Sequence, residues 1–239
     1  MITRRYLLSS AAAFLFLSTT HGFARIIPGN GLPWQPNAGS PPAPVRPGPW
    51  KFFTADEASM VEAMVDRLIP ADNLGPGGKE AGCAVFIDRQ LAGPYGSADD
   101  AYMRPPFMPG TPSQGYQGPD APAARYRESL KALDAHVKNG SSGKFFHQLS
   151  PAEQDKILAD LEAGKIELKD KGFFALLLKN TMEGFFADPI YGGNRDMAGW
   201  KLIGFPGARY DYRDWIDKHN QKYPLPPVGI MGRTAWNME

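Results

Sequence analysis

Apolar residues recur at helical spacing in several stretches of the chain, most clearly in TADEASMVEAMVDRLIP at residues 54–70. The apolar positions that fall on one face of this stretch are Met60, Val61, Met64, Val65 and Leu68. Thr54 and Glu57 have the spacing of a capping box, in which each residue bonds the backbone of the other. Pro70 then interrupts the pattern, so we expect a helix that begins after Thr54 and ends before Pro70.

The same kind of pattern predicts further helices along the chain. Their expected positions are 79–91, 123–137, a helix that opens at LSPAEQ with Ser150 as its cap, the stretch KGFFALLLKNTMEGFF at 171–186, and a short helix around 212–219. No run of alternating or β-branched residues continues for five positions. We therefore expect a mainly α fold, a compact helical domain joined to long extended arms and loops.

Proline and glycine dominate two long stretches, an arm at residues 25–50 and a loop at residues 93–122. This composition favours extended backbone in the arm, and a loop of this length within a domain is usually functional or disordered. Large aromatic residues are concentrated in these stretches and in the C-terminal tail, namely Trp34, Trp50, Tyr95, Tyr102, Phe107, Tyr116 and Trp236. A small helical core cannot cover all of them, so we expect a partner surface to do so.

The N-terminal residues MITRRYLLSSAAAFLFLSTTHGFA have the layout of an export signal, with basic residues, an apolar run and then small residues. The apolar run 7–17 is about half the roughly 20 residues of a membrane-spanning helix. Arg4 and Arg5 are adjacent, as in twin-arginine signals, which export folded proteins. TRRYLL departs from the commonest form of that motif, and the unfolded-chain route is the alternative. We expect residues 1–24 to be the signal, 25–50 the arm, and 51–239 the helical domain.

Charge and metal-ligand spacing exclude several classes of function. Removal of residues 1–24 takes away two of the 26 basic side chains and none of the 25 acidic ones, so the remainder is nearly neutral. Nucleic-acid binders normally carry a basic excess, and we expect no nucleic-acid partner. One cysteine and four scattered histidines offer no haem c, iron–sulfur or zinc spacing, so no cofactor or metal site is expected in this chain.

Three short motifs could carry chemistry, and each has a plainer structural interpretation. GPGGKEAG at 75–82 resembles a phosphate loop but follows a helix rather than a strand, which favours a connecting turn. Cys83 is interpreted as a small buried residue, with an intermolecular thiol as the alternative. Glu183 and Asp188 could form an acid and base pair, although residues at a helix end more often cap it.

ADPIYGGNRDMAGWKLIGFPG at residues 187–207, here called the docking segment, combines glycines with specific polar and aromatic residues. It can be a compact turn or a contact surface for another protein. The residues that we assign to partner docking are Tyr191, Gly192, Gly193, Asn194, Arg195, Asp196 and Trp200. We expect the glycines to permit a tight turn, Arg195 and Asp196 to pair locally or across an interface, and Trp200 to supply apolar area.

Four stretches together carry a resemblance to a known family. They are FFTADEASMVEAMVDRLIPAD, GPGGKEAGCAVFIDRQLAGPYG, LSPAEQDKIL and NTMEGFFADPIYGGNRDMAGWKLIGFPGARYDYRDW. The chain closely resembles subunit 3, the small or gamma subunit, of bacterial gluconate 2-dehydrogenase. The resemblance implies a periplasmic complex with a large FAD-bearing flavoprotein, a multihaem cytochrome c and a small subunit without a redox centre. It also implies that the twin-arginine translocon exports the flavoprotein together with the small subunit, and that the complex is held at the inner membrane by its partners.

Small subunits of this kind also accompany fructose, sorbitol and glucose dehydrogenases, so the resemblance leaves the oxidised substrate open. The preferred interpretation is a noncatalytic subunit for export, maturation and docking of the flavoprotein. The sequence leaves two rival functions open. One is a helical hydrolase that uses Glu183, Asp188 or Arg195, and the other is a freestanding periplasmic binding module.

Overall fold

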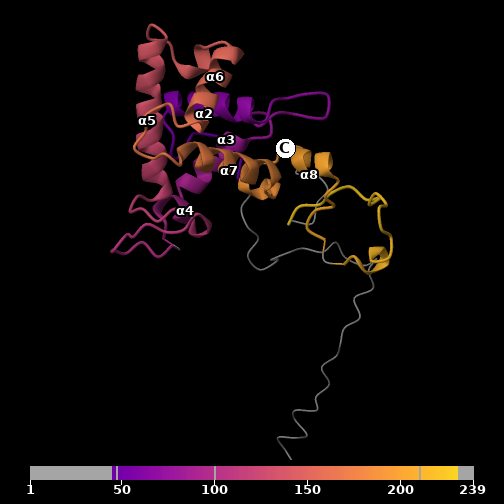
Figure 1. Cartoon of the computed structure of the whole chain (residues 1–239). Helices are drawn as coiled ribbons and strands as arrows, with labels where there is room; N and C mark the ends of the chain where they lie inside the picture. The colour runs from indigo at the N-terminus through magenta and orange to yellow at the C-terminus, as the bar shows by residue number, and fades with distance from the viewer. Residues whose placement is uncertain (1–44, 47, 100, 210, 231–239) are drawn as a thin grey trace, which may run out of the picture. The chain divides into compact units, whose positions relative to one another are not determined.

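Helices and their connecting loops make up the structure, a computed structural model that describes residues 45–46, 48–99, 101–209 and 211–230 (Figure 1). Within these ranges there is no β-strand, only two isolated bridges, Asp72 with Gly75 and Gly207 with Val228. The expected mainly α fold is therefore confirmed. The predictions for Arg4, Arg5 and most of the arm concern residues outside the described ranges.

The α-helices are α2 (Ala55–Leu68), α3 (Cys83–Leu91), α4 (Pro94–Ser97), α5 (Pro122–Gly140), α6 (Pro151–Glu162), α7 (Phe173–Phe186) and α8 (Ala198–Ile203). Single 3-10 turns lie at η1 (Pro112–Gln114), η2 (Phe146–Gln148), η3 (Pro189–Tyr191), η4 (Arg195–Met197) and η5 (Arg213–Trp215). Among the residues that the structure describes, no helix combines the length and the apolar character needed to cross a membrane.

Two helices begin where their capping residues predict. The Thr54 hydroxyl accepts a hydrogen bond from the Glu57 amide at 3.3 Å, and the Glu57 carboxylate accepts one from the Thr54 amide at 2.9 Å. Ser150 and Glu153 make the same reciprocal pair at the start of α6. An N-cap side chain of this kind stabilises a helix by about 1 kcal/mol. The predicted starts of α2 and α6 are confirmed.

Other predicted boundaries differ from the structure. The helix expected at 79–91 begins at Cys83, because the chain before it is held in turns, with Gly82 in the left-handed region at φ 81°. The short helix expected around 212–219 is only the 3-10 turn η5. The short helices α4 and α8 were not predicted from the sequence. Both flank loops in which glycine and proline hide the helical spacing.

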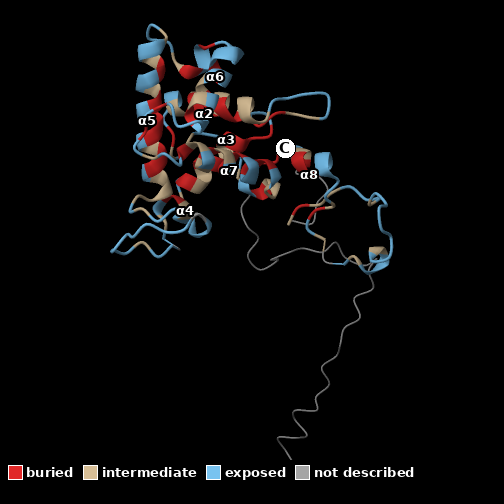
Figure 2. Ribbon diagram, in the orientation of Figure 1, coloured by how far each residue is buried: buried red, intermediate tan, exposed pale blue. Residues whose placement is uncertain are grey.

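The core lies around α7, which packs against α2, α3, α5, α6 and α8 (Figure 1). The buried faces of these helices point toward one another (Figure 2). Tyr126 and Phe173 are fully buried and meet edge to face, with ring centroids 5.3 Å apart. Asn180 of α7 is also buried, and its side chain bonds the Tyr126 hydroxyl at 2.9 Å and the Tyr95 hydroxyl at 3.0 Å. This polar contact joins α4, α5 and α7.

A buried carboxylate fixes the point where the N-terminal arm meets the helical domain. Asp88 of α3 has no exposed surface, and its oxygens accept hydrogen bonds from the amides of Lys51, Phe52 and Phe53, each at 2.9 Å. The Arg89 guanidinium contacts the same carboxylate. A buried charge is costly unless it is paired and hydrogen-bonded, and here three backbone donors and one cation meet that need.

The aromatic residues of the arm and the loop divide into two groups. Trp50 and Tyr95 pack against the core of their own chain, so no partner is needed to cover them. Tyr102, Phe107 and Tyr116 are exposed, at 86%, 38% and 44% of their surface. Trp34 and Trp236 lie outside the described residues. The expectation of a partner surface therefore concerns fewer aromatic residues than the sequence suggested.

Candidate docking surface

The docking segment follows α7 and is tied to the end of that helix by a buried amide. The Asn194 side chain has no exposed surface; its Nδ2 donates to the Ala187 carbonyl at 2.8 Å, and its Oδ1 accepts from the Gly199 amide at 2.8 Å. One side chain therefore joins the end of α7 to the first turn of α8. Asn194 acts inside the chain rather than on its surface.

Two glycines of the segment lie where a side chain would collide with its surroundings. A Cβ on Gly193 would come within 2.2 Å of the Gly184 carbonyl oxygen of α7. Gly192 has φ 94°, and a Cβ there would come within 2.7 Å of the Val45 side chain. The amide of Arg195 next donates to the Ala81 carbonyl at 3.0 Å. Glycine is therefore required for close packing of the segment against α7 and the start of α3.

Asn194, Asp196 and Met197 all have positive φ, at 45°, 55° and 57°. For residues with a Cβ this left-handed conformation costs roughly 1–2 kcal/mol each. Such backbone persists only where the surrounding contacts determine it, and it is concentrated at functional sites. Here the contacts are the Asn194 hydrogen bonds and the burial of Met197, which is 1% exposed.

Trp200 is buried within its own chain. It is 5% exposed, its Nε1 donates to the Phe186 carbonyl at 2.8 Å, and its ring meets Phe205 edge to face at 5.1 Å. The surface that we expected Trp200 to offer a partner is thus largely covered by its own chain, with Phe186 of α7 and Phe205 in contact with it. Of the predicted docking residues, Tyr191 and Asp196 are exposed and Arg195 is partly exposed. For these three residues the docking role stays a prediction.

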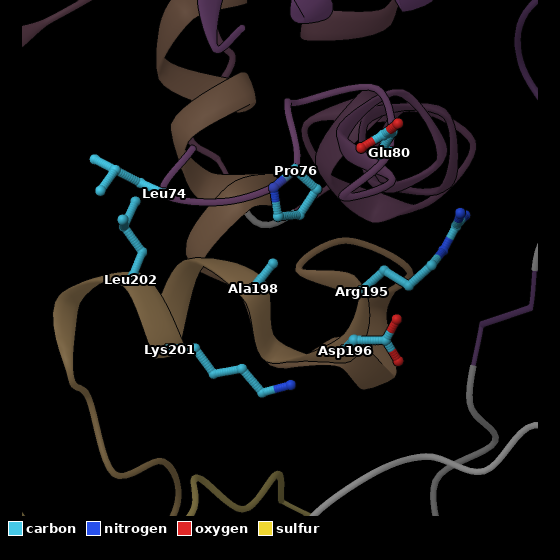
Figure 3. A pocket seen from close by; sticks show the side chains of 8 residues that line it. All are labelled: Leu74, Pro76, Glu80, Arg195, Asp196, Ala198, Lys201 and Leu202. Carbon is cyan, nitrogen blue, oxygen red and sulfur yellow. The ribbon is translucent and has the colours of Figure 1, made fainter. Parts of the chain in front are cut away.

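The exposed part of the segment forms one wall of a pocket of about 480 Å³, here called the α8 pocket. The docking segment contributes Arg195, Asp196, Ala198, Lys201 and Leu202 to the lining of this pocket. Leu74, Pro76 and Glu80 line it from the loop between α2 and α3 (Figure 3). Arg195 and Asp196 are therefore brought together with residues more than a hundred positions earlier in the chain.

Charged side chains of both signs line the α8 pocket without pairing with each other. Within the described ranges, no ion pair is formed by the four charged residues of the pocket, which are Glu80, Arg195, Asp196 and Lys201. Lys79, which lies beside them in the chain, pairs with Glu62 at 3.4 Å. The Arg195 guanidinium extends away from the Asp196 carboxylate (Figure 3). The local pair expected between these two residues is not formed, which leaves the pairing across an interface as the prediction.

An apolar patch borders the pocket. Leu202 and Ile203 at the end of α8 expose 47% and 60% of their surface, Phe205 just after the helix exposes 44%, and Leu74 on the opposite loop exposes 70%. Leu74 and Leu202 both line the pocket, and Figure 3 shows them at the same end of it. The sequence patterns did not indicate Leu74, Glu80, Lys201 or Leu202 as site residues. The available signal was a leucine in the turn ADNLGPGG, where a polar residue is usual.

Cys83 lies at the start of α3 with no exposed surface. Burial raises the pKa of its thiol from 9.0 to about 12. Because the thiolate is the reactive form and needs access to its partner, this environment is that of an unreactive structural cysteine. The interpretation of Cys83 as a small buried residue agrees with this placement, and the intermolecular thiol draws no support from it.

The two carboxylates proposed as an acid and base pair serve local structure. Glu183 accepts from the Asn180 side chain at 2.9 Å. Asp188 caps η3 through the Ile190 amide at 3.1 Å and also accepts from the Ile230 amide at 2.6 Å. Residues 75–77 form no helix or strand and residues 78–82 form turns, in agreement with the connecting-turn interpretation. In the described ranges, no group of three or more histidine, cysteine or acidic side chains could hold a metal ion.

The chain was compared with family models, curated proteins and solved structures. A family model described as Gluconate 2-dehydrogenase subunit 3 matches residues 55–207. The matched range runs from the start of α2 to the end of the docking segment and includes every residue of the α8 pocket. No curated protein and no solved structure matches the chain.

Proposed function

Because the chain belongs to the gluconate 2-dehydrogenase subunit 3 family, we propose that it is the noncatalytic small subunit of a periplasmic, FAD-dependent gluconate 2-dehydrogenase. The observation that carries the proposal is the match over residues 55–207, which makes the chain a subunit of a multisubunit dehydrogenase. In this proposal the flavoprotein subunit binds FAD and oxidises the sugar acid. A multihaem cytochrome c subunit accepts the electrons and associates with the membrane.

The small subunit has two tasks in this proposal. It docks the folded flavoprotein, and its N-terminal signal with Arg4 and Arg5 directs the pair to the twin-arginine translocon. FAD is acquired by a folded protein, and a route that threads unfolded chains would remove the cofactor. Export of the folded pair preserves it. The surface features that support docking are the unpaired charges of the α8 pocket and the apolar patch beside it.

Replacement of Arg4 and Arg5 by lysine tests the export task. We expect the flavoprotein to stay in the cytoplasm with its FAD bound, and the periplasmic gluconate oxidation to fall to background. Fractionated cells are assayed for flavin and for dye-linked gluconate oxidation, with Lys131→Arg at an exposed position of α5 as the matched conservative control. Full periplasmic activity in the double variant would contradict joint export.

A further inference from the structure

The chain that leads into α2 is fixed to the helical domain at two separate points. Residues 45–46 and 48–53 belong to it and are here called the strap. Near its end the strap is held by Asp88 of α3, which accepts hydrogen bonds from three strap amides. Arg127 of α5 also donates to the Phe52 carbonyl at 2.7 Å, and its guanidinium lies 4.2 Å from the centre of the Phe52 ring. This end of the strap is therefore tied to two helices.

The beginning of the strap is fixed to the docking segment. The Val45 amide donates to the Ile190 carbonyl at 2.9 Å. A Cβ on Gly192 would come within 2.7 Å of the Val45 side chain and within 3.2 Å of the Val85 side chain of α3. Val45 therefore packs closely on the backbone of Gly192, a position where only glycine leaves enough room.

The docking segment in turn contacts the start of α3. A Cβ on Gly82 would come within 2.7 Å of the Gly192 carbonyl oxygen, and the Arg195 amide donates to the Ala81 carbonyl at 3.0 Å. The helix that follows carries Asp88, which holds the strap. The strap, the docking segment and α3 thus form a closed ring of contacts between three parts of the chain that are distant in sequence.

The ring includes a backbone conformation that is unfavourable by itself. Asn194, Asp196 and Met197 have positive φ, and such residues keep this conformation only where their surroundings determine it. The strap contacts residues 190 and 192, which directly precede this turn. The turn also carries Arg195 and Asp196, two residues of the wall of the α8 pocket. Loss of the strap contact would therefore remove one of the constraints that hold this wall.

We propose that the strap is a conformational switch for the α8 pocket. While the strap is bound, the turn at residues 194–197 is held and the wall with Arg195 and Asp196 is formed. When the strap is released, the turn relaxes toward unstrained backbone and the wall loses its shape. A partner that needs the formed wall would hold the strap in place, and one that binds the released strap would disrupt the wall, because coupling between two sites is reciprocal.

Hydrogen exchange of single amides in the full-length chain tests the switch. Three amides of the docking segment serve as probes, because each donates a hydrogen bond that depends on the strained turn. The Arg195 amide donates to the Ala81 carbonyl at 3.0 Å, the Met197 amide to the Asn194 carbonyl at 2.8 Å, and the Gly199 amide to the Asn194 side chain at 2.8 Å. Their exchange rates report how often the turn opens.

Val45→Asp weakens the strap at the docking segment, since it places a carboxylate against the Val85 side chain, where the charge is poorly solvated. We expect the three probe amides to exchange about tenfold faster in this variant. Arg46→Asp is the matched control, because Arg46 is the next residue and is exposed. Exchange of the probes in the control, and of the amides of α6 in both variants, should stay as in the wild type.

Asp88→Asn weakens the other end of the strap and tests whether the coupling passes through it. We expect the probe amides to exchange about fivefold faster or more, although none of them contacts Asp88. In the double variant with Val45→Asp, the strap is already released from the docking segment. Asp88→Asn should then add little to the exchange rates of the probes, as for two changes that act through one contact.

Each contrary result has a definite meaning. Unchanged probe exchange in Val45→Asp or in Asp88→Asn would overturn the switch, and so would equal acceleration in Arg46→Asp. Equal acceleration in α6 would also overturn it, because the loss of stability would then be global. If Asp88→Asn has its full effect in the Val45→Asp background, Asp88 acts through α3 alone and the strap transmits nothing.

Discussion

At the scale of single residues, substitution of Trp200 distinguishes a role in the packing of the fold from a role in docking. It is 5% exposed and bonds the Phe186 carbonyl at 2.8 Å, so its area is already covered by its own chain. We expect Trp200→Ala to lower the free energy of unfolding by about 3–5 kcal/mol, as for other buried tryptophans. Urea unfolding measures the loss, and Trp200→Phe should recover part of it. Unchanged unfolding together with weaker flavoprotein binding would show that Trp200 is an interface residue after all.

Because of Cys83, we expect the free energy of unfolding to fall as the pH rises into the alkaline range. Burial raises the pKa of the folded thiol from 9.0 to about 12, while the unfolded thiol keeps its ordinary value. The unfolded chain therefore loses this proton first as pH rises. The contribution of the protonated Cys83 thiol to the free energy of unfolding is fully present below about pH 9. It is lost between about pH 9 and about pH 12, with about 2 kcal/mol lost by pH 10.5.

The measurement compares urea unfolding of the wild type and Cys83→Ala from pH 8 to pH 10.5. Burial also raises the pKa of Tyr126 well above its usual range, so both proteins should lose stability with pH. The wild type should lose more, and the difference between the two proteins belongs to Cys83. Parallel pH profiles would show that the thiol is not buried as described.

At the scale of elements, Asp88 couples α3 to the segment that leads from the arm into α2. Its carboxylate accepts from three consecutive amides, at residues 51–53. In Asp88→Asn one oxygen becomes a donor and faces backbone N–H groups. We expect the free energy of local opening at residues 51–53 to fall by about 2–3 kcal/mol, so that these amides exchange with deuterium faster. Glu162→Gln at the end of α6 is the control, and equal exchange in both variants would contradict the anchoring role.

The sequence predicted those elements whose signals are local. Thr54 with Glu57 and Ser150 with Glu153 lie within one turn of each other, so their capping boxes could be recognised without knowledge of the fold. The start of α3 at Cys83 was not predictable in this way. It depends on Gly78 lying against Val65 of α2, a contact between residues that no local spacing links.

In the candidate site too, some features have local sequence signals and others depend on contacts between distant residues. Glycine and the Asn-Arg-Asp run marked residues 192–196 as unusual, and these residues do form a strained, closely packed turn. Which of them face solvent could not be predicted, because burial of Asn194 and Trp200 depends on where α7 ends. Leu74 was missed because its importance comes from its position opposite Leu202, which only the folded chain creates.

At the scale of the whole molecule, the proposed function leaves the redox chemistry to the partner subunits. We expect the purified chain alone to bind neither FAD nor haem and to oxidise no gluconate, since electron transfer belongs to its partners. Absorbance between 350 and 600 nm after incubation with FAD, followed by gel filtration, checks this. Flavin bound in a one-to-one ratio to the lone chain would contradict the assignment, and hydrolysis of sugar esters or glycosides would favour the rival enzyme.

The central claim is that the chain is an obligate partner of an FAD-dependent dehydrogenase. The most direct measurement is purification of the tagged full chain from cells that make the whole complex, followed by native mass spectrometry and an assay of gluconate oxidation. We predict one assembly that contains the flavoprotein with its FAD and oxidises gluconate or a related sugar acid. Recovery of the chain alone, from cells in which the flavoprotein is folded and active elsewhere, would contradict it.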